Sequence, residues 1–258
     1  MPFNNSESIS NSIFELIHSD IWGPFPVASI GGSRYFVVFI DDYSHYSWIF
    51  PMKSRSEILP IYSNFAKMIE TQFSKSIKTF RSDNALKYTQ YAFQALLHSY
   101  GIVHHLTCPG TFQKNGRAER KLRHILDTVC ALLLSAKVPA PFWGELALNA
   151  VHAIDRIPST IIHNQTPYER LFGSPFNYHH LYSFGFACFV LLQPHEYKNL
   201  SLDLDFVVSL VMVKLKKGIG VMILSLIVFV FLVMLSFGNI DYLLNSLTFV
   251  LPQLPPLF

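Results

Sequence analysis

Residues 107–127 read TCPGTFQKNGRAERKLRHILD and lead from a loop into a long helix. The segment Cys108-Pro109-Gly110 has the chemistry of a turn, and Asn115 is a residue type that caps helices. Apolar residues then recur at steps of four, three, four and three residues, so they form one buried stripe on a helix that we expect to reach about Ser135. These apolar residues are Ala118, Leu122, Ile125, Val129 and Leu132.

Glu119 lies beside this stripe, one turn into the predicted helix, and five cations surround it in the sequence. The cations are Lys114, Arg117, Arg120, Lys121 and Arg123, which with one acid give a local net charge of +4, although only 14% of the chain is charged. A nucleic acid would meet the chain here. The alternative is a glutamate that favours the helix dipole beside an ordinary solvated basic face, and both interpretations stay open at this point.

The composition of the whole chain indicates an ordinary globular protein. Its 258 residues suffice for one large domain or two small ones, 50% of them are hydrophobic, and the net charge is only +3. Cys108, Cys130 and Cys188 form no Cys-x-x-Cys pair, which argues against a zinc knuckle or a disulfide framework. We therefore expect a reduced, intracellular protein of the nucleus or cytoplasm.

The pattern of apolar residues predicts strands and helices from residue 13 to residue 157. We expect strands at 13–17, 35–40, 45–50, 77–80 and 102–106, and further helices at 56–73, 91–100 and 142–157. The second and third strands are expected to pair antiparallel through a turn at Asp41 and Asp42, which we interpret as turn formers. The order predicts an α/β fold in which helices pack on the faces of a mixed sheet.

Three carboxylates stand at the ends of these elements. Asp20 and Asp83 each follow a predicted strand, and Glu119 opens a helix. Hard divalent cations prefer oxygen ligands, and a pair of them can activate an attacking oxygen and stabilise a leaving one. Three converging acids would repel one another unless a metal neutralised them. For any single aspartate a turn-forming role is commoner, and the sequence alone does not show convergence.

Several motifs together resemble the integrase catalytic core of copia-type LTR retrotransposons, within the retroviral integrase superfamily. That family carries an Asp, Asp, Glu triad with 35 residues between the last two members, and here residues 84–118 separate Asp83 from Glu119. The resemblance runs from about Ile13 to about Leu200. Its motifs are SDIWGP, RYFVVFIDDYS, FRSDN, QKNGRAERKLRHIL, PAPFWGELALNAVHAIDRIPS, QTPYERLFGSP and LYSFGFACFV.

The resemblance implies a ribonuclease-H-like fold with a mixed five-stranded sheet and helices on both faces. It implies trimming of DNA 3′ ends and transfer of those ends into target DNA, with two Mg²⁺ or Mn²⁺ ions, by a homo-oligomer. Asp20, Asp83 and Glu119 would be the catalytic residues and the metal ligands. Gln113 and Asn115 match the polar loop beside the glutamate and would contact DNA. From charge alone we predict phosphate contacts for Lys114, Arg117, Arg120, Lys121 and Arg123, with a solvated face as the alternative for each.

The chain departs from the family pattern in two loops. Ala85-Leu86-Lys87 stands where the family has two glycines and an acid, and Phe112 stands where it has proline. These departures leave open a non-catalytic, nucleic-acid-binding remnant as the alternative function. A ribonuclease H proper shares the fold but spaces its acids differently.

The composition changes after residue 200. Residues 219–237 are uncharged and nearly all apolar, and they are long enough for a transmembrane helix, which needs about 20 residues. We interpret residues 201–258 as a frameshifted tail, because reading the family's downstream codons one base later yields VSLVM and KGIGVMIL, as found from Val208 and from Lys217. We therefore expect no genuine membrane partner, with membrane anchoring as the alternative. The predicted organisation is a disordered segment 1–12, a core 13–157, a post-core segment 158–200 and this tail.

Overall fold

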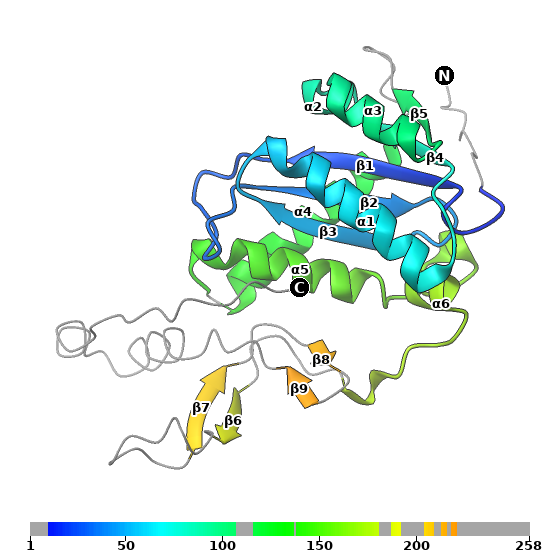
Figure 1. Cartoon of the computed structure of the whole chain (residues 1–258). Coiled ribbons are helices and arrows are strands. Elements are labelled where there is room, and N and C mark those ends of the chain that lie inside the picture. The colour runs from blue at the N-terminus through cyan, green and yellow to red at the C-terminus, as the bar shows by residue number, and fades with distance from the viewer. Residues whose placement is uncertain are drawn as a thin grey trace, which may run out of the picture. The chain divides into compact units, whose positions relative to one another are not determined.

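The computed structural model describes residues 10–106, 116–136 and 138–180, together with the strand backbone at 187–191, 204–208, 213–215 and 218–220. The chain divides into two compact units, Met1–Tyr182 and Ser183–Phe258. In the first unit a five-stranded sheet has the order β3-β2-β1-β4-β5 (Figure 1). Its strands are β1 Leu16–Trp22, β2 Tyr35–Asp41, β3 Ser47–Met52, β4 Thr79–Ser82 and β5 Val103–Leu106.

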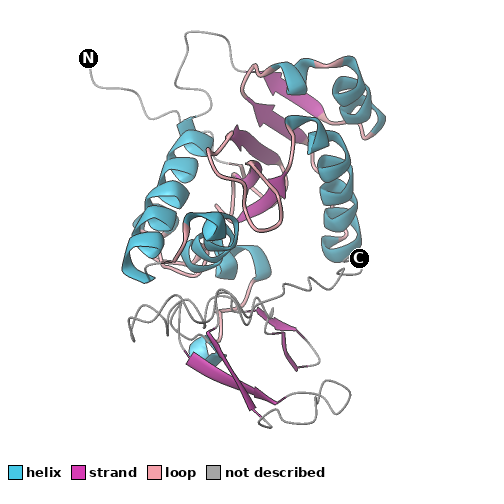
Figure 2. Ribbon diagram, turned by 90° about the vertical axis from the view of Figure 1, so that its left-hand side faces the viewer, coloured by secondary structure: helices cyan, strands magenta, loops and turns pink. Residues whose placement is uncertain are grey.

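The sheet is mixed, as the sequence predicts. Strand β2 pairs antiparallel with both β1 and β3, whereas β4 pairs parallel with β1 and with β5. Helices lie on both sides of the sheet (Figure 2). They are α1 Ile58–Phe73, α2 Leu86–Thr89, α3 Tyr91–Ser99, α4 Gly116–Ala136, α5 Trp143–Ile154 and α6 Pro167–Phe172, with short 3-10 turns at Arg55–Glu57, Ala140–Phe142, Thr160–Ile162 and Tyr178–His180. The predicted α/β fold, a mixed five-stranded sheet with helices on both faces, is confirmed.

Helices α1 and α3 cover one face of the sheet because their apolar residues recur at helical spacing. Phe39 of β2 stacks on Phe65 of α1 with ring centroids 4.5 Å apart, and Phe80 of β4 lies against Phe93 of α3 at 5.7 Å. All four rings are at most 1% exposed. Strand β2 is apolar on both faces because both are covered, which explains its uninterrupted hydrophobic run.

Helices α4 and α5 cover the opposite face. Alternate side chains of a strand point to opposite faces of a sheet, so Phe36 turns away from Phe39 and toward α5. It packs against Trp143 of α5, with ring centroids 6.2 Å apart, and Trp22 of β1 meets the same indole at 5.8 Å. The indole nitrogen of Trp143 donates to the carbonyl oxygen of Val27 at 3.0 Å. These contacts hold α5 against the sheet, and α4 packs beside α5.

Some predicted boundaries were wrong in ways that matter for the site. Strand β1 begins at Leu16 and continues to Trp22, so Asp20 lies inside the strand and not beyond its end. The short helices α2 and α6 were not predicted, because four and six residues are too few for helical periodicity to be recognised.

The residues that the structure describes in the second unit form two antiparallel pairs, β6 Ala187–Leu191 with β7 Leu204–Val208 and β8 Val213–Leu215 with β9 Gly218–Gly220. The prediction of a frameshifted tail and most of the apolar segment 219–237 lie outside the described residues. Among the helices that the structure describes, none combines the length and apolar character needed to cross a membrane.

Candidate active site

Strand register brings the first two predicted acids side by side. β1 and β4 run parallel, with Ile17 opposite Phe80 and His18 opposite Arg81. Continuing this register by two residues sets Asp20 beside Asp83, which directly follows β4. Ile17 and Phe80 both belong to the core under α1, so by the two-residue alternation Asp20 and Asp83 both face the other side of the sheet, where α4 lies.

Helix α4 supplies the third acid from above that same face. It packs against β1 and β2 through an apolar stripe in which Ala118 and Ile125 are fully buried and Val129 is 5% exposed. Glu119 follows Ala118 in the first turn of the helix and is exposed. All three predicted acids therefore lie on one side of the sheet.

Asp83 and Glu119 are close enough to Asp20 to raise its pKa. The pKa of Asp20 is raised from 3.8 to about 7, first by burial, then by the negative charge of Asp83 and, more weakly, of Glu119. Burial also raises the pKa of Asp83, against a hydrogen bond that its Oδ1 accepts from the backbone N–H of Ala85 at 3.3 Å. Asp20 Oδ1 accepts from the N–H of Ile21 at 2.8 Å. The raised pKa of Asp20 thus indicates that the negative charge of the three acids is only partly compensated by the surrounding residues.

The donor set of the cluster fits a hard divalent cation, because carboxylate oxygens are what such ions prefer. Within the described ranges, however, no three acidic, histidine or cysteine side chains lie together tightly enough to form a ready metal-binding group. Mg²⁺ usually takes only one or two protein carboxylates and fills its remaining positions with water and phosphate. The arrangement therefore suits an ion shared between the protein and a phosphate-bearing ligand.

The predicted DNA-contacting residues divide into three groups. Gln113, Lys114 and Asn115 lie outside the described residues. Arg120 and Arg123 are exposed on α4. Arg117 forms an ion pair with the buried Asp42, and Lys121 forms one with the buried Asp155. For these last two cations the structure favours a role within the protein, and their predicted phosphate contacts stay untested.

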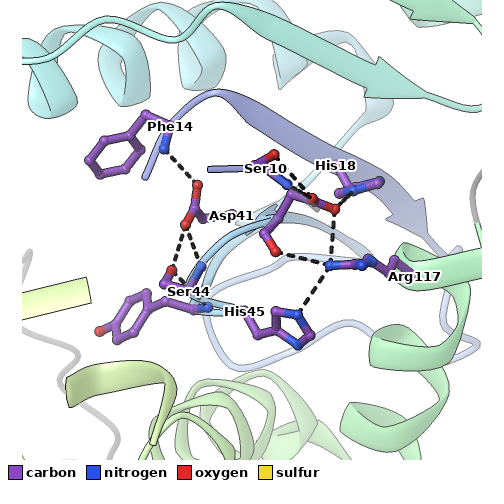
Figure 3. A network of polar contacts seen from close by, with 9 residues as sticks. Ser10, Phe14, His18, Asp41, Ser44, His45 and Arg117 are labelled. Atoms are coloured by element: carbon purple, nitrogen blue, oxygen red, sulfur yellow. Dashed lines mark hydrogen bonds and ion pairs between the residues drawn. The ribbon is translucent and has the colours of Figure 1, made fainter. Parts of the chain in front are cut away.

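Asp42 is the centre of a buried polar network, and Figure 3 labels its partners Ser10, His18 and Arg117. It is 2% exposed, and His18 Nε2 lies 2.7 Å from its Oδ1. Ser10 donates to its Oδ2 from both its N–H and its hydroxyl, each at 3.0 Å. Arg117 Nη1 lies 3.0 Å from its Oδ1 and donates to its carbonyl oxygen at 2.9 Å. A residue that the sequence indicated only as a turn former therefore binds strand β1 and helix α4 to the β2–β3 turn.

A second buried aspartate anchors the same helix one turn further on. Asp155, at the end of α5, is 1% exposed and accepts from Lys121 Nζ at 3.0 Å and from the N–H of Ser47 at 3.0 Å. Burial raises the pKa of Asp155, while the charge of Lys121 opposes that rise. No motif spacing in the sequence signals this pair, because its partners come from different helices.

Arg55 is a further residue near the acids that the sequence did not indicate. It is exposed in the 3-10 turn that follows β3, and its Nη2 donates to the carbonyl oxygen of Gly23 at 2.8 Å. Its guanidinium carbon also lies 5.5 Å from the ring centroid of Tyr35. The positive charge of Arg55 lowers the pKa of both Asp20 and Asp83, against the larger effect of burial. Arg55, which contacts Gly23 just after β1, therefore compensates part of the negative charge of the two aspartates.

Comparison with known proteins finds similar sequences. Residues 11–111 match the family model of the integrase core domain. The chain is 36% identical over 200 residues to the retrovirus-related Pol polyprotein from transposon RE2 of Arabidopsis thaliana, a match that covers 78% of this chain and 14% of that protein. The corresponding polyprotein from transposon TNT 1-94 of Nicotiana tabacum is 36% identical over 189 residues, covering 73% of this chain and 14% of the relative. The chain thus spans about a seventh of these relatives.

A solved structure is also similar. It is the HTLV-2 integrase catalytic core domain in complex with magnesium, in a trimeric form. The TM-score is 0.48 at 15% sequence identity, and the match covers 62% of this chain and 98% of that one.

Proposed function

This chain carries an integrase core domain of the kind found in copia-type retrotransposon Pol polyproteins, and we propose that the domain is a polynucleotidyl transferase. Its substrates would be the DNA ends of the element and a target DNA. The reactions would be hydrolytic trimming of the 3′ ends and their transfer into the target. Oligomerisation of the chain stays a prediction.

The proposal is supported most by the strand register that sets Asp20 beside Asp83 on the face covered by α4. In the proposed site these two acids and Glu119 hold the divalent ions. Bound Mg²⁺ or Mn²⁺ would neutralise the phosphate and polarise its oxygens. Two ions are the number that the family resemblance implies.

The chain's own residues would orient the DNA. The exposed cations Arg120 and Arg123 follow Glu119 on the same helix, so they are available for contacts with DNA phosphates. Arg55, fixed by Gly23 and Tyr35, offers a further guanidinium beside the acids. Arg117 and Lys121 are excluded from this role in the proposal because their charges face buried carboxylates.

A strand-transfer assay with Mn²⁺ and the full chain tests the function. Wild-type protein should join a labelled DNA end to a target plasmid, and Glu119→Gln, which keeps the size of the side chain, should not. Glu15→Gln is the matched control, since Glu15 stands just before β1 and pairs with Lys78 away from the proposed site. Equal joining by wild type and Glu119→Gln would remove the enzymatic proposal and leave a nucleic-acid-binding domain.

A further inference from the structure

We propose that Arg117 and Lys121 are positioning residues: by pairing with Asp42 and Asp155 they set the rotation of helix α4 about its own axis and so aim Glu119 at the strand acids. This inference rests on the proposed function, in which Glu119 is a metal ligand. It assigns the two cations to the geometry of the site and not to DNA.

The positions around the helix make this possible. Residues of an α-helix are separated by about 100° around its axis, so Arg117 and Lys121 lie about 40° apart, and Glu119 lies about 160° from each of them. The buried stripe through Ala118 and Ile125 lies between them, against the sheet. The helix rests on the sheet through this stripe. The ion pairs of Arg117 and Lys121 on one side of the stripe therefore determine the rotation of the helix, and with it the direction of Glu119 on the other side.

The anchor points are themselves held in place. Asp42 is held by His18 and by Ser10, through contacts that do not involve Arg117. Asp155 is fixed by the N–H of Ser47 at 3.0 Å. Each aspartate thus presents an oriented carboxylate to its cation, so the side chains of Arg117 and Lys121 each have one favoured position.

The turn between β2 and β3 joins the two anchors. His45 lies in this turn at a φ of 63°, a conformation uncommon for a residue with a side chain. Its Nε2 accepts from Arg117 Nη1 at 3.1 Å, and its carbonyl oxygen accepts from Lys121 Nζ at 3.2 Å. Asp41 supports the turn by accepting from the N–H and the hydroxyl of Ser44 at 2.8 Å and 2.6 Å (Figure 3). One turn therefore engages both cations of the helix.

The energetics favour a role in geometry over one in net stability. A buried ion pair contributes little to stability when compared with well-packed apolar groups of the same volume, because desolvation offsets the attraction. What the pair does supply is a fixed distance and direction. In metalloproteins, residues that orient the metal ligands commonly change metal affinity by about 10–100-fold when they are replaced.

The experiment measures Mg²⁺ binding to the full chain without DNA, by titration calorimetry, beside thermal unfolding in EDTA. Arg117→Met and Lys121→Met should each raise the Mg²⁺ dissociation constant about tenfold or more. Arg117→Lys, which restores the charge, should recover part of the affinity. Two variants are used so that a folding failure in one leaves the other as the test.

The matched control is Val129→Ala, a substitution on the buried stripe of the same helix that leaves both ion pairs intact. It should lower the unfolding temperature but keep the Mg²⁺ dissociation constant within about twofold, since packing loss alone does not rotate the helix. A wild-type Mg²⁺ affinity in both methionine variants would overturn the inference. So would an equal loss of affinity in Val129→Ala.

Glu119→Gln separates this inference from the proposed function. If Glu119→Gln leaves Mg²⁺ affinity unchanged, Glu119 is not a ligand, and the proposed function and the positioning role both fail. If Glu119→Gln weakens binding while Arg117→Met and Lys121→Met do not, only the positioning role fails.

Discussion

Two aspartates on the same face of the sheet, Asp20 and Asp42, meet opposite electrostatic surroundings. Burial and the charges of Asp83 and Glu119 raise the pKa of Asp20 to about 7. Burial also acts to raise the pKa of Asp42, but the hydrogen bond and charge of His18, followed by the charge of Arg117, outweigh it and hold that pKa below its usual value. The protein's own residues lower the pKa of Asp42, whereas the pKa of Asp20 stays raised although the charge of Arg55 opposes the rise.

This difference separates a structural carboxylate from a candidate functional one. Both are aspartates near a strand end, and both lie under α4. Counting acids would not distinguish them, whereas charge compensation does, because a buried charge without a partner is retained only at a cost to stability. Four substitutions test the contrast, from the largest expected effect to the smallest.

Asp83→Asn should abolish strand transfer while leaving the fold intact. A metal ligand contributes several kcal/mol to transition-state stabilisation, which corresponds to a loss of about a thousandfold or more in rate. The measurement is single-turnover joining with Mn²⁺, paired with thermal unfolding in EDTA. Retention of a tenth of the wild-type rate would place Asp83 outside the metal site.

Asp42→Ala should destabilise the fold by about 3–5 kcal/mol, because it removes a buried carboxylate that holds Ser10, His18 and Arg117 together. Urea unfolding followed by tryptophan fluorescence measures the change. Asp42→Asn keeps the hydrogen-bonding shape and should lose less. A cost of Asp42→Ala below about 1 kcal/mol, the size expected for an exposed pair, would contradict the network described here.

Asp20→Asn should stabilise the protein in EDTA, and the gain should grow with pH. The folded-state pKa of Asp20 is raised from 3.8 to about 7, so its contribution to stability is lost as pH rises through that interval. The asparagine variant removes the loss, and its advantage should increase from pH 5 to pH 7 and then level off at roughly 1–3 kcal/mol. Unfolding curves at pH 5, 6, 7 and 8 measure it. Asp127→Asn, on the exposed face of α4, is the control. An advantage that shrinks as pH rises would reverse the sign of the argument.

Lys78→Met should have no measurable effect on the unfolding temperature. Lys78 and Glu15 form an ion pair of 2.8 Å, shorter than the 3.0 Å between Arg117 and Asp42, but the Lys78 side chain is 65% exposed. Solvent and salt screen such a pair, so its short distance carries little stability. Differential scanning fluorimetry against wild type is sufficient, and a drop comparable with that of Asp42→Ala would show that distance matters more than burial here.

The sequence by itself determined the class of fold and the identity of the candidate acids. Apolar periodicity is a local property of the chain, so it predicted α1 from Ile58, Phe65 and their neighbours, and β2 from an unbroken hydrophobic run. Motif spacing singled out Asp83 and Glu119 because 35 residues separate them. These signals require no knowledge of how the elements meet.

Only the tertiary structure decided which cations are free and which acids are compensated. In the sequence Arg117 and Arg120 look alike, as members of one basic run, yet one is paired with Asp42 and the other is exposed. Asp42 and Asp155 acquire their roles through strand register and helix packing. Asp42 meets Arg117 across 75 positions of the chain, and Asp155 meets Lys121 across 34. Compensation of charge depends on distance and burial in space, and neither quantity is written in the order of the residues.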